Sequence, residues 1–349
     1  MRKKSFNKMY FFVFSLLILM AAFLIGSQSR AISAEKEIVW NLSAWGSKMA
    51  FTEPVHDYAA YMEQKTNGRL KIKIHYGSVL SSPKEQLDGI KGGLFELAFF
   101  VASHAPGKTP LLTVGELPFI SPRENVQIGM VTSKLFEHPA IKKELLKWNA
   151  VPFLPAYVPN YHMMSRKPVR TLADFKGLRL RVGGDTGKVL SEFGVVAMMV
   201  PGVEVFDAVS KGTIDAVTFP WTFGFGANKI HEATKFAIDI PFGTLVSTSC
   251  MNKDAWDALP EEFKKYHMDW YYKSPQIWDE AYKRADKEFI PIFKKYLEFI
   301  QFPTSEAHKL IEKSSAVYEE WAKRMEDRGL PGREILNYYL KERKKVAGY

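Results

Sequence analysis

The stretch from Lys167 to Trp221 constrains the fold most, because strand and helix patterns alternate within it. Three short runs with strand character are separated by two segments with helical spacing, all within fewer than fifty residues. The strands are expected at 178–182, 197–200 and 214–219, and the helices at 186–193 and 203–211. Gly212 follows the second helix, where a left-handed cap is favoured. Units of this size require parallel strands with right-handed crossovers, so the stretch predicts a small α/β layer.

Arg181 is the candidate anchor for a ligand in this layer. Ligands of open α/β sheets bind beyond the carboxyl ends of the strands, and Arg181 lies near that end of the first strand. Strand alternation places Arg179 and Arg181 on the face opposite Leu180. A guanidinium there can bind a carboxylate bidentately, which contributes about 1.5–3 kcal/mol. Gly184 lies at the start of the next helix, where backbone N–H groups favour an anion. On spacing alone, an ordinary surface arginine is the alternative.

Several segments carry a family resemblance in the same order along the chain. They are KTNGRLKIKIHYGSVLSSPKEQLDGIKGGLFELAF at 65–99, LADFKGLRLRV at 172–182, FGVVAMMVPGVEVFDAVSKGTIDA at 193–216 and MNKDAWDALPEEFKKY at 251–266. Together they resemble the DctP-type solute-binding proteins of TRAP transporters, the tripartite ATP-independent periplasmic systems. The resemblance covers nearly the whole chain after residue 34. It implies an α/β, periplasmic-binding-protein-like fold, with two α/β lobes, a cleft between them and a long helix spanning both lobes.

The resemblance also implies a function and partners. Arg181 corresponds to the arginine that binds the substrate carboxylate in this family. The membrane partner would be a permease with a small and a large integral subunit, without an ATPase. Sialic-acid binders have a polar amide near 217–221, and keto-acid binders have a Glu-Trp pair that holds a cation, but this chain has Val-Thr-Phe-Pro-Trp there. Tyr161 lies where sialic-acid binders have a second basic contact. We therefore expect no metal, no cofactor and no sugar acid.

The first 34 residues have the pattern of a secretory signal peptide. A basic start is followed by an apolar run from Met9 to Gly26 and a short polar tail, with a plausible cleavage site after Ala34. An uncleaved membrane anchor is the alternative, because the apolar run is long enough to span a bilayer. No cysteine lies near the cleavage site, which excludes a lipoprotein anchor. The sequence therefore predicts export to the periplasm.

Both lobes are expected to be discontinuous in sequence. An apolar strand at 150–157 leads to a first crossing at 158–160, and segments at 236–240 and 244–251 lead the chain back. The expected boundaries are 1–34 for the signal peptide, 35–157 plus 246–285 for lobe I, and 158–245 plus 286–349 for lobe II and the C-terminal helices. In lobe I, strands at 37–43, 69–75 and 95–101 alternate with helices at 52–66 and 83–91, which predicts a second parallel sheet.

Helix ends follow from capping residues. Thr52 is expected to cap the first helix of lobe I. From Pro260 onward the chain is expected to be helical, with helices at 260–272, 276–296, 305–328 and 331–345. Ser305 is expected to cap a helix in this region. The apolar side chains of that helix expected to lie inward are Leu310, Ile311 and Val317.

Aromatic side chains gather at predicted strand ends and at the crossing. The candidate substrate-binding residues beside Arg181 and Gly184 are Trp45, Phe100, Tyr161, Phe219 and Trp221. Core packing is the alternative for the aromatic ones. Arg181 is the only basic residue that can be placed in the cleft, and a second carboxylate would be buried there without a partner. The expected ligand is a monocarboxylate with a hydrophobic body, aromatic or aliphatic.

Signatures of other function classes are missing from the sequence. There is no G-x-S-x-G nucleophile motif, and none of the eight histidines forms an H-x-x-x-H pair. The run Gly183–Lys188 imitates a phosphate loop, but its glycine spacing is short and Val189 replaces the Ser or Thr that holds magnesium. Cys250 is the only cysteine, so no intramolecular disulfide can form. Enzymatic, metal and nucleotide chemistry are therefore disfavoured.

The charge pattern argues against a nucleic-acid surface. The net charge of +10 falls to about +5 once the five basic residues of the first 34 are removed, and the remaining basic residues lie among acids. The excess would favour anionic solutes or simply solubility. We expect a monomeric solute-binding protein that delivers a small organic carboxylate to a membrane permease. The alternatives are a protein that presents a solute to a sensor kinase and, in the enzyme class, a secreted α/β hydrolase or lyase.

Overall fold

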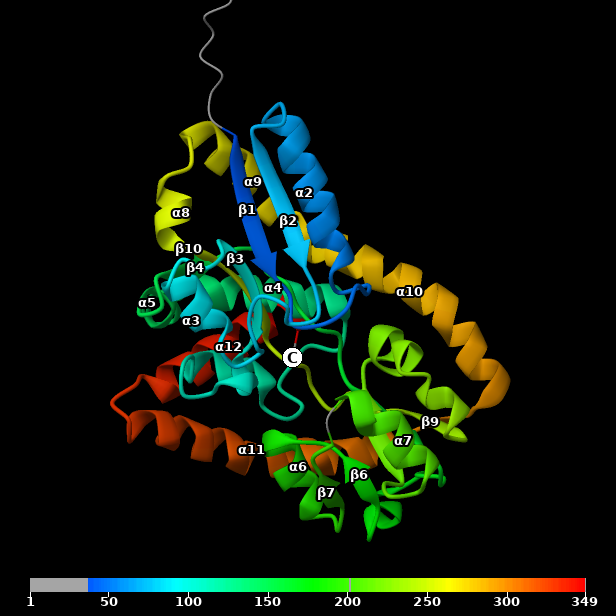
Figure 1. Ribbon diagram of the computed structural model, residues 1–349. Helices are drawn as coiled ribbons and strands as arrows, with labels where there is room; N and C mark the ends of the chain where they lie inside the picture. Colours follow the sequence, from blue (N-terminus) through cyan, green and yellow to red (C-terminus); the bar gives the residue numbers. More distant parts are fainter. Residues whose placement is uncertain (1–36, 201, 349) are drawn as a thin grey trace, which may run out of the picture.

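Two lobes, each built on one β-sheet, make up the computed structural model (Figure 1). It describes residues 37–200 and 202–348. The signal peptide predicted at 1–34 lies outside the described residues. No helix of the described part combines the length and the apolar character needed to cross a membrane. The two-lobed α/β architecture confirms the predicted fold class.

The first lobe contains a five-stranded mixed sheet in the order β2-β1-β3-β10-β4. Its strands are β1 (Ile38–Ser43), β2 (Leu70–His75), β3 (Leu97–Val101), β4 (Ala150–Pro152) and β10 (Ser247–Asn252). β1 pairs in parallel with β2 and β3, as the strand–helix pattern predicted. β10 returns from the second lobe antiparallel to β3 and β4. The helices of this lobe are α2 (Glu53–Lys65), α3 (Gln86–Lys91), α4 (Asn125–Glu137), α5 (Pro139–Leu146), α8 (Lys253–Asp257) and α9 (Glu261–Tyr271).

The second lobe contains a six-stranded mixed sheet in the order β11-β9-β5-β8-β6-β7. Its strands are β5 (His162–Ser165), β6 (Arg179–Arg181), β7 (Val196–Met198), β8 (Ala216–Phe219), β9 (Phe236–Asp239) and β11 (Glu298–Gln301). β6 pairs in parallel with β7 and β8, which confirms the parallel layer predicted between Lys167 and Trp221. Between these strands lie α6 (Gly184–Ser191) and α7 (Val205–Ser210). Gly212 has a φ of 73°, the left-handed cap expected after the second helix.

Two extended segments, around residues 158–161 and 242–244, run side by side from one lobe to the other, and we call them the crossings. The Tyr161 N–H donates to the Gly243 carbonyl at 2.8 Å, and the Phe242 N–H donates to the Tyr161 carbonyl at 2.9 Å. The Thr244 hydroxyl donates to the Val158 carbonyl. The crossings are therefore bonded to each other and form a two-stranded connection.

Helix α10 (Ser274–Tyr296) joins the cores of the two lobes (Figure 1). Trp278 and Tyr282 belong to the apolar core of the first lobe, and Phe293 belongs to a core of the second lobe. The Trp278 indole N–H also donates to the carbonyl of Phe51 at 3.1 Å. The long helix expected to span both lobes is therefore present.

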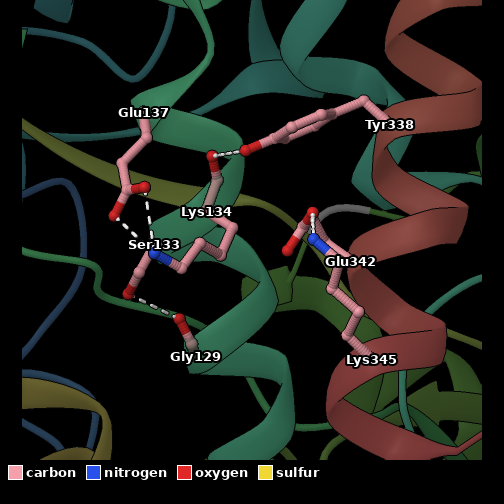
Figure 2. Close-up of polar contacts among 7 residues, drawn as sticks. All are labelled: Gly129, Ser133, Lys134, Glu137, Tyr338, Glu342 and Lys345. Carbon is pink, nitrogen blue, oxygen red and sulfur yellow. Dashed lines mark hydrogen bonds and ion pairs between the residues drawn. The ribbon is translucent and has the colours of Figure 1, made fainter.

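The last two helices each pack against a helix of one lobe. α11 (Thr304–Glu326) contacts α6 of the second lobe, and α12 (Gly332–Ala347) contacts α4 of the first lobe. Figure 2 shows the α4–α12 contact, where the Tyr338 hydroxyl donates to the Lys134 carbonyl at 3.0 Å. Lys134 in turn bonds Glu137 on its own helix, and Lys345 bonds Glu342 (Figure 2).

Thr52 occupies the N-cap position of α2, as predicted, but its side chain bonds Met49 and makes no capping hydrogen bond to the helix. Three local expectations were wrong. β11 adds an edge strand parallel to β9 in the region predicted to be helical, between the helices expected at 276–296 and 305–328. Ser305 lies inside α11, whose N-cap position is Pro303. Ile311 is 45% exposed, because the buried stripe of α11 follows Leu310, Ser314, Val317 and Trp321.

Candidate functional site

A cavity of about 760 Å³ lies between the lobes. The first lobe contributes Ser103, His104, Thr113 and Glu116, and the crossings contribute Tyr161 and residues 242–245. The second lobe contributes residues 181–186, Met199 and Thr218. Trp321, Arg324 and Met325 come from α11, and Arg328 comes from the turn that follows it. Of the predicted binding residues, Arg181, Tyr161 and Gly184 line this cavity. Its volume is in the range of pockets that hold small organic ligands.

Arg181 ends β6 and reaches the cavity from the second lobe. Its Nε donates to the Val200 carbonyl at 3.3 Å, and its Nη1 donates to the Thr218 carbonyl at 3.1 Å. Its guanidinium carbon lies 4.4 Å from the ring centroid of Phe219. Burial lowers the pKa of Arg181, and the charge interaction that opposes this comes from Tyr161 rather than from a carboxylate. A largely buried cation is therefore held in place by neutral groups and faces the cavity.

Arg179, two residues earlier, has its own carboxylate. Its Nε and Nη2 both lie 2.9 Å from oxygens of Asp215, which is almost fully buried, and the same bonds hold the pKa of Asp215 well below its usual range. Leu180 between them is fully buried, as the strand alternation predicted. The two arginines of the RLR strand thus differ, because Arg179 has an anionic partner and Arg181 does not.

Gly184 lies at the first position of α6 and lines the cavity next to Arg181. The helix starts two residues earlier than predicted, and Gly184 has a φ of 62°, which favours glycine. The first N–H groups of a helix lack intrahelical partners, so this end of α6 adds hydrogen-bond donors to the wall that carries Arg181.

The other four predicted aromatic residues do not line the cavity. Phe219 lies under the Arg181 guanidinium and is 8% exposed. Trp221 stacks on His162 at 4.5 Å, because a π-helical turn begins at this residue and directs it away from the cleft. Trp45 contacts the edge of His104, which itself lines the cavity, at 5.7 Å between ring centroids. Phe100 is buried in the core of the first lobe.

Glu116 is a cavity residue that the sequence did not reveal. It ends a 3₁₀-helix at Leu111–Glu116, and its Oε1 accepts the N–H of Ser103 at 3.3 Å and the N–H of Val246 at 3.2 Å. Burial raises the pKa of Glu116 to about 7, although the hydrogen bonds from Ser103 and Val246 oppose the shift. The only signal in the sequence is an acid in an otherwise apolar segment, Leu-Leu-Thr-Val-Gly-Glu-Leu-Pro.

Two further arginines line the cavity, Arg324 from α11 and Arg328 from the turn after it, which corrects the expectation that Arg181 is the only basic residue there. Arg324 lies 3.1 Å from Asp185, which also pairs with Lys188. Arg328 is exposed. Both differ from Arg181, because Arg324 has an acidic partner and Arg328 lies in solvent.

Within residues 37–200 and 202–348, no three His, Cys, Asp or Glu side chains are grouped closely enough to hold a metal ion. The residues of the cavity that carry formal charge are the arginines described above, Glu116, Asp185 and Asp327. The arrangement is that of a site that binds an anionic group, with a buried guanidinium on one wall and a carboxyl on the other.

Comparisons with known proteins agree with this geometry. The chain matches the model of bacterial extracellular solute-binding protein, family 7 (DctP), over residues 43–324. It is 24% identical over 300 residues to the outer membrane transporter protein TsaT of Comamonas testosteroni, with 82% of this chain and 85% of the relative covered. It is 25% identical over 237 residues to a monocarboxylate 2-oxoacid-binding periplasmic protein of Nostoc sp., with 65% of this chain and 63% of the relative covered. A crystal structure of a TRAP solute binding protein of Rhodoferax ferrireducens, in complex with copurified benzoate, matches with a TM-score of 0.77 at 20% identity and covers 89% of this chain and 99% of that one.

Proposed function

Because the chain belongs to family 7 of the bacterial extracellular solute-binding proteins, the DctP family of TRAP transporters, we propose that it captures a small organic monocarboxylate in the periplasm and delivers it to a TRAP permease. The family and the fold are those of substrate-binding proteins rather than of enzymes. The segment at 1–34, with its basic start and apolar run, supports export.

The proposal depends mainly on one observation, that Arg181 is largely buried without an acidic partner. Burying a cation without an anionic partner is costly, so such a residue indicates an anion that arrives from outside. Its two hydrogen bonds to carbonyls use two of its five N–H groups and fix the guanidinium, which leaves three donors for a carboxylate. The N-terminal end of α6 at Gly184 adds donors on the same side.

The cavity supports a ligand with one carboxylate and an apolar body. Arg181 is the one cavity arginine, among the residues described, that is both largely buried and without an acidic partner. Apolar surface comes from Phe242, Trp321 and Met325. The relative from Nostoc binds monocarboxylate 2-oxoacids and the protein from Rhodoferax ferrireducens copurified with benzoate, which favours the same class here.

Binding is proposed to close the two lobes over the ligand. Arg181 comes from the second lobe and Glu116 from the first, so a ligand between them contacts both. The closed monomer would be the form that the permease recognises. The lobe boundaries proposed are 35–157 plus 246–285 for lobe I and 158–245 plus 286–349 for lobe II with the C-terminal helices.

A thermal-shift screen tests the proposal. Arylacetates, aryl keto acids and branched aliphatic acids should raise the melting temperature, while C4-dicarboxylates and sugar acids should not. Mass spectrometry of the small acid that copurifies with native protein should identify a member of the first group. A melting temperature raised only by dicarboxylates or sugar acids would contradict a monocarboxylate site.

Binding is proposed to need no metal ion. The turn at 217–221 carries Val-Thr-Phe-Pro-Trp in place of a cation-holding Glu-Trp pair, and Phe219 lies under Arg181. Affinity after exhaustive chelation should equal affinity with added calcium or sodium, measured by titration calorimetry. A large loss of affinity on chelation would show that a cation bridges the ligand.

A further inference from the structure

The cavity has Arg181 and the start of α6 on one wall and Glu116 on the other. Arg181 and the start of α6 offer N–H groups from the second lobe. On the first lobe, the Thr113 hydroxyl donates to the Pro110 carbonyl at 2.7 Å. The Thr113 oxygen also accepts the Trp321 indole N–H at 2.8 Å, so this hydroxyl has no hydrogen left for a ligand. Glu116 is the charged group of that wall.

The bonds of Glu116 show what kind of group it accommodates. Its carboxyl is bonded by the N–H groups of Ser103 and Val246 and by the Ser103 hydroxyl. A carboxylate has about four acceptor positions, so these three donors leave capacity for one more, and Glu116 lines the cavity. Every partner of Glu116 is a donor, and a ligand group that meets the ionised carboxylate must be a donor too.

We infer that Glu116 selects ligands that carry a hydrogen-bond donor, a hydroxyl or an N–H group, in addition to the carboxylate bound by Arg181. This inference rests on the proposed function and names its substrate class more narrowly: hydroxylated or N–H-bearing monocarboxylates. A second carboxylate or a keto oxygen would meet the ionised form of Glu116 as one acceptor against another, so such ligands should bind less tightly than hydroxylated ones. An N–H···O or O–H···O bond to an ionised carboxylate is stronger than a neutral one, which makes the selection effective.

A substitution of Glu116 should reverse the preference. In Glu116→Gln the amide oxygen can still accept the N–H groups of Ser103 and Val246, so the amide NH₂ faces the cavity and offers donors where the wild type accepts. Glu144→Gln is the matched control. Glu144 is also a buried carboxyl of the first lobe that accepts two backbone N–H groups, from Leu111 and Leu112, and burial also raises its pKa to about 7, but it does not line the cavity.

The probes are five acids of one skeleton: phenylacetate, its hydroxylated forms mandelate, 3-hydroxyphenylacetate and 4-hydroxyphenylacetate, and the keto acid phenylglyoxylate. In calorimetry with the wild type, at least one hydroxylated acid should bind about tenfold or more tightly than phenylacetate, the range expected for a hydrogen bond to a charged group. Glu116→Gln should lose most of this advantage, because a hydroxyl can accept from the amide but no longer bonds a charged group, and it should bind phenylglyoxylate more tightly than the wild type does. Glu144→Gln should keep the wild-type order.

A second readout needs no variant. A donor on the ligand stabilises the ionised form of Glu116, so the hydroxylated acid should release more protons on binding at pH 7 than phenylacetate does. Titrations in two buffers of different ionisation enthalpy measure this release. His104 and Tyr161 on the same walls stay neutral at pH 7, because burial lowers the pKa of His104 and raises that of Tyr161 to about 12.

The outcomes separate this inference from the proposed function. Hydroxylated acids that bind no tighter than phenylacetate in the wild type, or a preference that survives Glu116→Gln, would overturn the role of Glu116 while the carboxylate site stands. Failure of all five acids to bind the wild type would overturn the aromatic monocarboxylate proposal and this inference with it.

Discussion

Whereas Arg179 on the same strand bonds the carboxylate of Asp215, Arg181 is surrounded by neutral groups. Its charge lies over the face of Phe219 and against two backbone carbonyls, and these contacts are worth most when an anion completes them. Replacing Arg181 with alanine should weaken ligand binding by about 2–5 kcal/mol, because the ligand carboxylate would be buried without a partner. Arg181→Lys should also weaken it, since an ammonium cannot reproduce the planar fork. Titration calorimetry with the acid that copurifies measures both.

Arg179→Lys is the control for this prediction. Arg179 is on the same strand, but it bonds Asp215 and does not line the cavity, so its replacement should leave affinity unchanged. Affinities of the Arg181 variants within twofold of the wild type would remove Arg181 from the site.

Glu144 makes the stability of the first lobe depend on pH. Its pKa in the folded state is raised from 4.5 to about 7, mainly by burial, so the folded protein binds more protons than the unfolded chain between these values. Stability must therefore fall as the pH rises through this window. A tenfold change in a proton-binding constant corresponds to about 1.4 kcal/mol, so the loss from Glu144 should be about 1–3 kcal/mol.

Chemical denaturation at pH 4.5 and pH 7.5 checks this. The unfolding free energy of Glu144→Gln should fall less across this range than that of the wild type, because an amide does not titrate. Glu116 has the same direction of shift, so some pH dependence should remain in the single variant. Equal pH dependence in variant and wild type would show that Glu144 does not titrate in this range.

At the scale of single residues, sequence reasoning located Arg181, Tyr161 and Gly184, but not Glu116 or the directions of the aromatic side chains. A strand-end arginine in an alternating run is a local pattern, and its parity is set by the backbone alone. The directions of Phe219 and Trp221 depend on the turn after β8 and on packing against residues distant in sequence. Glu116 could not be recognised, because Ser103 and Val246 reach it only in the folded chain.

At the scale of elements, the crossings depend on one glycine. Gly243 has a φ of 118°, which side-chain-bearing residues rarely adopt, and its carbonyl accepts the Tyr161 N–H that bonds the two crossings. Gly243→Ala should destabilise the protein by about 1–3 kcal/mol through backbone strain. No atom lies closer than 3.4 Å to the added methyl carbon, so the expected loss is conformational and not a clash.

Thermal or chemical unfolding measures this, with Gly107→Ala as the control. A methyl carbon added at Gly107 would have no atom within 4 Å, and this glycine has no positive φ, so its replacement should change stability by less than about 0.5 kcal/mol. If the two variants were equally stable, the crossing would tolerate a side chain at 243 by changing its path.

Helices and strands whose hydrophobic pattern lies entirely within their own stretch of sequence were predicted well. The β6–α6–β7–α7–β8 layer alternates short strand patterns with helical ones, Gly212 follows its second helix, and α10 has an apolar stripe long enough to identify. β11 was missed, because only one of its four residues is buried and it lies between two long helices. Its strand conformation comes from pairing with β9, which no local pattern shows.

At the scale of the whole molecule, the lobes are connected in ways that restrict how they can move. The crossings bond each other beside the cavity, and α10 contributes side chains to the cores of both lobes. Trp321 of α11 donates to Thr113 of the first lobe, while α11 also contacts α6 of the second. Closure must therefore be a rotation about these connections, with small shifts of the packed helices.

Such a rotation predicts a ligand-dependent change of shape. Arg181 lies on the second lobe and Glu116 on the first, so a bound acid draws the two walls together and excludes water from between them. The radius of gyration measured by small-angle X-ray scattering should decrease when the wild type is saturated with its acid. Arg181→Ala at the same ligand concentration should keep the larger value, because the contact from the second lobe is missing. Arg179→Lys should close like the wild type, which separates loss of the anion contact from any general effect of altering β6. An unchanged scattering curve for the saturated wild type would mean that the lobes already have their binding geometry without ligand, and that affinity comes from a rigid site rather than from closure.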